Sequence, residues 1–128
     1  MAASTVTERY EATPEAAWAL VGDFPGIGGV FPGIEDVVVE DDKRTFTLSG
    51  MRMTEQLVAR DDATRSITYS IVDGLPLEAH ETTVTVAQAD GGCEIAFRVV
   101  TVPEEAQPLF VDSYQRALEH LHSRLDAS

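Results

Sequence analysis

The chain has 128 residues, and its 22 acidic and 9 basic side chains give a formal net charge of −13. Such an acidic surface repels nucleic acid and anionic membranes, and the sequence has no basic patch. We therefore expect neither nucleic acid nor a membrane as a partner. A single cysteine, Cys93, excludes an internal disulfide and a cysteine-based metal cluster. The length predicts one domain over residues 1–128, and the lack of a signal pattern or long apolar run predicts a cytoplasmic protein.

The first quarter of the chain predicts a strand followed by two helical segments. Apolar and polar residues alternate through Thr5–Ala12, as in a half-buried strand. Thr13 can cap a helix that starts at Pro14 and ends near Gly22. The glycine-rich segment Phe24–Gly33 also holds two prolines and predicts a loop or short irregular helix. Its apolar residues need burial, which fits either a static connector or a mobile lid.

The middle of the chain predicts six antiparallel strands. Turn-forming Asp, Gly, Ser and Pro residues separate segments with alternating apolar residues. Successive strand side chains point to opposite faces of a sheet, so one parity of each segment lies inside. The expected strands are Ile34–Glu40, Arg44–Ser49, Met51–Arg60, Arg65–Val72, Ala79–Ala87 and Cys93–Val102.

The last segment predicts a long amphipathic helix. Its apolar residues recur at helical spacing, and polar residues occupy the positions between them. A helix that follows a curved sheet has to lay this stripe against the sheet's inner face. The stripe comprises Leu109, Phe110, Tyr114, Ala117, Leu118, Leu121 and Leu125.

Three ionisable residues share the interior parity of their strands. Glu55 lies between Met53 and Leu57, and His80 and Tyr69 occupy equivalent positions on later strands. A buried carboxylate is costly unless it is paired, neutralised or faces a wet cavity, so we expect a polar pocket rather than a solid core.

Each of the three has a structural alternative to a functional role. A salt bridge from Arg44 or another strand neighbour would satisfy Glu55. His80 would be exposed if it lies at the cavity rim, and a backbone carbonyl would satisfy a buried Tyr69.

Metal and phosphate chemistry find little support. His120 and His122 are two positions apart on a helix, so they point to different sides and are poor joint ligands. The glycines of the segment 24–33 lack the preceding strand and the Lys-Ser/Thr of a phosphate loop. We therefore expect no metal and no cofactor.

Three phrases of the sequence resemble one family. They are Ala12–Leu20 followed by Asp23-Phe24, Met53–Leu57 with Asp61, and Tyr69–Leu77. They are similar to motifs of the START-like polyketide cyclase/dehydrase superfamily, and the likeness spans nearly the whole chain. Phe97 departs from it, because many members carry tryptophan there.

The resemblance implies an α+β helix-grip fold. In this fold a curved seven-stranded antiparallel sheet wraps around a long C-terminal helix, with two short helices after strand one, and encloses an apolar cavity. The residues expected to line the cavity are Trp18, Phe24, Phe31, Met53, Leu57, Ile71, Phe97, Phe110 and Tyr114.

Two functions remain open at this stage. The first is a cofactor-independent cyclase or dehydratase, resembling an aromatase, in which Glu55 and His80 move protons and Tyr69 polarises a carbonyl of a polyketide-like or other apolar substrate. The second is a carrier that binds or sequesters a hydrophobic small molecule, as a monomer or homodimer. The number of titratable groups on the interior parity favours the enzyme.

Overall fold

The computed structural model describes residues 3–126 and follows the predicted order of elements. Strand boundaries differ from the predicted ones by at most two residues. The elements are β1 (Ser4–Tyr10), α1 (Pro14–Val21), the 3₁₀ helix η1 (Phe24–Gly29), β2 (Glu35–Glu40), β3 (Lys43–Leu48), β4 (Met51–Asp61), β5 (Ser66–Asp73), β6 (Ala79–Ala89), β7 (Gly92–Val102), the 3₁₀ helix η2 (Glu104–Ala106), α2 (Gln107–His120) and α3 (His122–Leu125).

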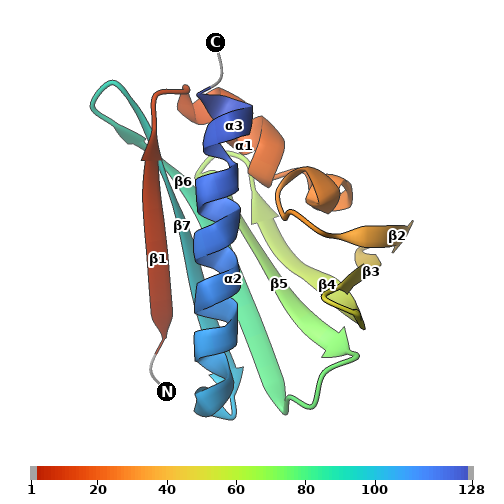
Figure 1. The fold of residues 1–128 in the computed structure, drawn as a ribbon. Helices are drawn as coiled ribbons and strands as arrows, with labels where there is room; N and C mark the ends of the chain where they lie inside the picture. The colour runs from red at the N-terminus through yellow and green to blue at the C-terminus, as the bar shows by residue number, and fades with distance from the viewer. Residues whose placement is uncertain (1–2, 127–128) are drawn as a thin grey trace.

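The strands form one seven-stranded antiparallel sheet in the order β1-β7-β6-β5-β4-β3-β2. The sheet curves, and α2 lies over its concave face, while α1 packs against β6 and β7 and η1 lies beside β2 (Figure 1). The α+β class and the helix-grip arrangement are therefore confirmed. Within residues 3–126, no helix is both long enough and apolar enough to span a bilayer.

Local sequence explains the two short helices. The Thr13 hydroxyl accepts a hydrogen bond from the Ala16 N–H at 3.1 Å, which caps α1, and Pro14 occupies the first helical position. The predicted irregular helix within the segment 24–33 is η1, which begins at Phe24.

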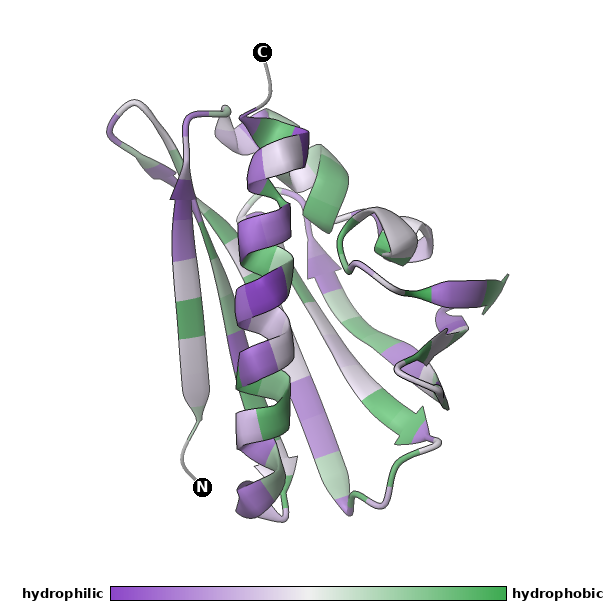
Figure 2. Cartoon of the chain, in the orientation of Figure 1, coloured by the Kyte–Doolittle hydropathy of each residue, from purple (hydrophilic) through white to green (hydrophobic). Residues whose placement is uncertain are grey.

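The core lies between the concave face of the sheet and the helices. The interior parity of the strands is buried, as at Ile67, Phe97 and Val99, which are at most 2% exposed. Hydrophobic and hydrophilic residues alternate along α2 and the strands, as this two-sided packing requires (Figure 2).

The prediction of the apolar helical stripe is wrong for one residue, Leu109. Leu109 is 77% exposed, whereas Tyr114, Ala117, Leu118 and Leu121 are buried. A helix turns by about 100° per residue, so Leu109 points about 140° away from Tyr114 and cannot share its face.

Candidate functional site

The interior holds a buried ion pair between β3 and β4. Arg44 and Glu55 are cross-strand partners in the register, and they are 4% and 5% exposed. The Nε and Nη2 atoms of Arg44 lie 2.7 and 2.6 Å from Oε1 of Glu55. The interior position predicted for Glu55 is confirmed, and its partner is the arginine that the structural alternative named.

Arg44 is also held from three other directions. Its Nη1 donates to the backbone carbonyl of Phe24 at 2.8 Å. Its guanidinium carbon lies 4.1 Å from the ring centre of Phe24 and 4.6 Å from that of Tyr69. The arginine therefore joins η1 to the sheet through charge, a hydrogen bond and ring contacts. Burial raises the pKa of the Glu55 carboxyl, while the charge and hydrogen bonds of Arg44 act in the opposite direction.

A line of hydroxyl groups continues from Arg44 toward β6. Tyr69 interacts with Arg44, and the Tyr69 and Tyr114 hydroxyls share a hydrogen bond. The Tyr114 oxygen lies 2.7 Å from Oγ1 of Thr82, which in turn lies 3.1 Å from Nε2 of His80. Burial raises the pKa of both tyrosines, so both stay un-ionised at neutral pH.

His80 ends this line. Its Nδ1 accepts a hydrogen bond from the Ile71 N–H at 3.0 Å, so in the neutral ring the proton sits on Nε2 and points to Thr82. Its ring centre lies 4.8 Å from that of Phe110. Burial lowers the pKa of His80 to about 4, so the imidazole is uncharged at neutral pH.

We call these side chains the polar row: they come from four strands and α2 and cross the apolar interior. The sequence predicted interior positions for most of these residues but assigned no role to Thr82. The signal that could have found it was its parity, because it lies two residues from His80 on the same face of β6. The members of the polar row are Glu55, Arg44, Tyr69, Tyr114, Thr82 and His80.

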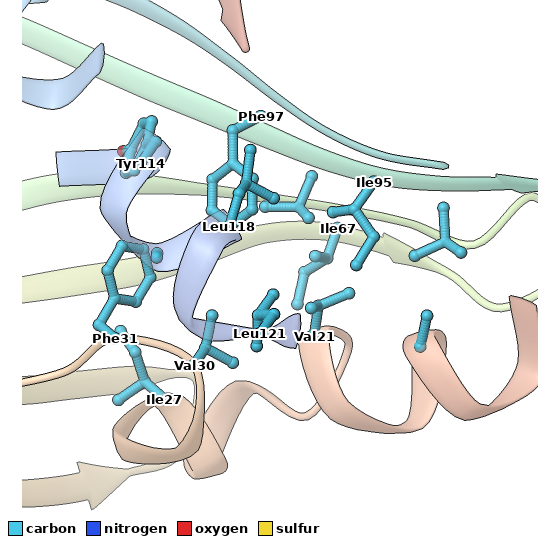
Figure 3. Packing of buried hydrophobic residues seen from close by; sticks show 14 of the residues in the cluster. Val21, Ile27, Val30, Phe31, Ile67, Ile95, Phe97, Tyr114, Leu118 and Leu121 are labelled. Atoms are coloured by element: carbon cyan, nitrogen blue, oxygen red, sulfur yellow. The ribbon is translucent and has the colours of Figure 1, made fainter. Parts of the chain in front are cut away.

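Aromatic rings fill the space beside the polar row. The Phe31 ring lies 5.9 Å from Phe97 and 5.8 Å from Tyr114, measured between centroids. Figure 3 shows Phe31 reaching from the segment after η1 toward α2. Phe110 is half-buried, with its ring 6.1 Å from that of Tyr114.

The interior cavity found among the described residues has a volume of about 10 Å³. That is at the lower limit for a single water molecule. The predicted enclosed cavity is therefore not confirmed as open space. Its lining includes Val30, Phe31, Arg44, Tyr69 and Phe97.

The remaining predicted ligand residues are scattered. Met53 is buried opposite Phe46, and Leu57 and Ile71 are half-buried. Trp18 makes its polar contacts outside the polar row, since its Nε1 donates to Asp62 at 2.9 Å and its ring lies 5.2 Å from the Arg60 guanidinium.

A second cluster ties the C-terminal end to β1. His122 lies on α3, with Nδ1 2.6 Å from Asp126 and Nε2 3.0 Å from Glu8. The hydrogen bond to Asp126 is the main cause of a raised His122 pKa. Among residues 3–126, no three potential metal ligands come together in a group that could hold an ion.

These features define a helix-grip protein with polar groups crossing an apolar interior. The family model for polyketide cyclase/dehydrase and lipid transport matches residues 1–126, and the chain belongs to this family. No curated protein sequence matches the chain.

Several solved structures share the fold. XoxI from Bacillus cereus is 23% identical with a TM-score of 0.90, covering 99% of this chain and 97% of that one. Ara h 8.0201 is 17% identical with a TM-score of 0.78 and covers 99% of both chains. TTHA0849 from Thermus thermophilus is 15% identical with a TM-score of 0.75 and covers 96% of both. At these identities, the likeness extends to the fold alone.

Proposed function

We propose that the protein binds an uncharged apolar small molecule that carries one hydroxyl or carbonyl group. The observation that carries this proposal is the polar row itself, which crosses an otherwise apolar interior between the sheet and α2. Sites for small molecules have this character, with apolar walls and a few polar groups that fix orientation. The family's description includes lipid transport, which fits a binding role.

The charges of the polar row favour a neutral ligand. Arg44 is the row's one cation and Glu55 its one anion, and they already pair at 2.6 Å. Burial keeps Tyr69 and Tyr114 un-ionised and His80 uncharged at neutral pH. A charged group entering this interior would find no free counter-ion in the row, so its desolvation would not be offset.

Binding is better supported than turnover. Glu55 is held by Arg44, and both ring nitrogens of His80 have hydrogen-bond partners. A general acid or base has to reach the proton that it transfers, so each of these groups would first have to release a partner. A hydroxyl of the row, by contrast, can add a ligand as a further hydrogen-bond partner.

Room for a ligand requires movement of aromatic side chains. Phe31 lies between η1 and β2, outside any helix or strand, so its ring can leave the interior without breaking backbone pairing of the sheet. Phe110 is half-buried and sits on the first turn of α2. A planar ring is the ligand shape that best replaces a phenylalanine ring against Phe97 and Tyr114.

Titrations with three related probes test the proposal. We expect 2-naphthol to bind saturably, naphthalene to bind more weakly, and the 2-naphthoate anion to bind weakest of the three. Fluorescence titration or calorimetry gives the three dissociation constants. Absence of saturable 2-naphthol binding, or tighter binding of the anion, would overturn the proposal.

A pair of tyrosine variants tests the role of the polar row. Tyr114→Phe removes a hydroxyl from the row and should weaken 2-naphthol binding about 5- to 10-fold, the worth of one hydrogen bond. Tyr10→Phe is the matched control, because the Tyr10 hydroxyl is also buried and donates to the Leu118 carbonyl outside the row. The control should keep the affinity of the wild type.

A further inference from the structure

The sheet divides between β5 and β6. The two strands pair over residues 66–69 and 82–85, and beyond Tyr69 and Thr82 the described residues of the two strands form no register pairs. β5 continues to Asp73 along β4, while β6 pairs with β7 from Ala79 onward. Figure 1 shows the two strands diverging toward the loop that joins them. We call this divergence the split.

Two anchors on opposite sides hold the split open. Gly74, at the end of β5, has a φ of +103°, and a Cβ there would lie 2.2 Å from the Arg52 carbonyl oxygen, so the glycine sits directly against β4. Glu78, at the other end of the connecting loop, donates its N–H to the Val102 carbonyl of β7 at 2.8 Å. The two ends of the connecting loop are thus held by different strands, β4 and β7, and these contacts keep β5 and β6 apart.

His80 closes the split on the inner side. Its imidazole accepts the Ile71 N–H from across the divergence, in place of a strand-to-strand backbone bond. An open depression of about 430 Å³ covers the same place and is lined by Ser70, Ile71, Ala79, His80, Glu81 and Val100. The lining combines outward-facing residues of β5, β6 and β7 with two inward-facing ones, so the depression reaches His80 through the split.

From this geometry we infer that the split is the entrance by which the ligand reaches the polar row, with the His80 side chain as its gate. The inference rests on the proposed function, because it assumes a ligand that enters the interior. Of the residues lining the depression, His80 is the one that bonds to Thr82 of the row. Turning the ring aside frees the Ile71 N–H, which water in the open depression can then satisfy.

The 3₁₀ helix η1, which also covers the interior, is held more firmly than the His80 side chain. Opening at η1 breaks the hydrogen bond from Arg44 to the Phe24 carbonyl and separates the Arg44 guanidinium from the Phe24 ring. A hydrogen bond from a charged group is about twice as strong as a neutral one. Passage at His80 breaks only neutral hydrogen bonds, so the split is the easier route.

Obstruction of the depression tests the entrance. Ala79→Trp places a large side chain in its lining, and Ala87→Trp is the matched control on the same strand and face, also exposed, outside the depression. Stopped-flow fluorescence with 2-naphthol measures both rates. We expect Ala79→Trp to lower association and dissociation together by about tenfold, with an unchanged dissociation constant, and Ala87→Trp to match the wild type.

A second measurement needs no ligand binding. Val99 is fully buried and pairs with Thr82 in the register, so Val99→Cys places a thiol behind the gate. Its alkylation by uncharged iodoacetamide, after subtraction of the Cys93 reaction, should be slower with Ala79→Trp than with Ala87→Trp. Slower alkylation without 2-naphthol binding would reject the proposed function and support the entrance. If 2-naphthol binds but Ala79→Trp changes neither its rates nor the alkylation, the entrance is overturned and the proposed function stands.

Discussion

At the scale of single residues, the pair of Arg44 and Glu55 places two opposite charges in the core at 4% and 5% exposure. Desolvation of such a pair cancels much of its attraction, so the pair adds little net stability as a unit. Loss of one partner is different, because the other is left buried without a counter-charge. The pair therefore fixes how β3, β4 and η1 fit together more than it strengthens the fold.

We predict that Glu55→Gln lowers the free energy of unfolding by about 3–5 kcal/mol, since it strands the Arg44 charge. The double variant Arg44→Met/Glu55→Leu should lose less unfolding free energy than the sum of the losses in Arg44→Met and Glu55→Leu alone. Urea denaturation measures each value. Arg116→Ala is the control, because Arg116 and its partner Asp112 are 70% and 65% exposed. This variant should lose less than about 1 kcal/mol of unfolding free energy. Additive losses across the Arg44 and Glu55 variants would contradict this account.

His80 makes stability fall in acid. Its pKa is about 4 in the folded protein against an ordinary value of 6.5 for an unburied ring, so the unfolded chain binds the proton more tightly. Stability from the neutral ring is complete above pH 6.5 and is lost as the pH drops toward 4, on the order of 3 kcal/mol in all. His80→Gln removes the titration while other groups remain. The difference between wild type and variant, measured by urea denaturation, should change over this window, and a constant difference would contradict the assigned cause.

At the scale of elements, His122 of α3 contacts Glu8 of β1 and Asp126, the residue that follows α3. Its pKa is raised, so its stabilising charge is complete below about pH 6.5 and is lost as the pH rises through the folded value. We expect the melting temperature of the wild type to fall above pH 6.5, and that of His122→Asn to stay level. The His80 effect ends at pH 6.5, so the two windows do not overlap. Equal slopes of melting temperature against pH for both proteins would count against this role of His122.

The elements themselves were largely predictable. Alternation of apolar and polar residues predicted the strands, and capping signals predicted α1, as the structure confirms. Strand parity predicted that Glu55, Tyr69 and His80 lie inside, and all three are buried. These signals are local to each segment. The link from Tyr114 to Thr82 joins residues 32 positions apart. It depends on how α2 is rotated against the sheet, which no single segment encodes.

Occupancy of the interior was not predictable. Phe31 lies in a segment without helical or strand periodicity, so its sequence assigns it no face. The expected cavity followed from the family resemblance and from polar residues on the interior parity. Whether such a space is open or filled depends on side-chain volumes contributed by several elements at once.

At the scale of the whole molecule, 22 acidic residues face only 9 basic ones. Mutual repulsion of these charges favours expanded states. Salt shortens the screening length from about 30 Å at 0.01 M to about 8 Å at 0.15 M, which relieves the repulsion. We therefore expect the melting temperature to rise by several degrees over this range of sodium chloride, with no such rise in equivalent osmolarity of sucrose. A fall in melting temperature with salt would show that attractive pairs outweigh the repulsion.

The split in the sheet also divides the molecule mechanically. β1, β7 and β6 pack with α1 and α2, and among the described residues the backbone pairing of β5 with β6, which joins them to β4, β3 and β2, is limited to four register pairs. A seam this short lets one part open while the other stays folded. In native-state amide exchange, β2 to β4 should therefore exchange together at a lower opening free energy than β6 and β7. The fold would then behave as two cooperative units, a stable helix-backed one and a more labile one that carries Arg44 and Glu55.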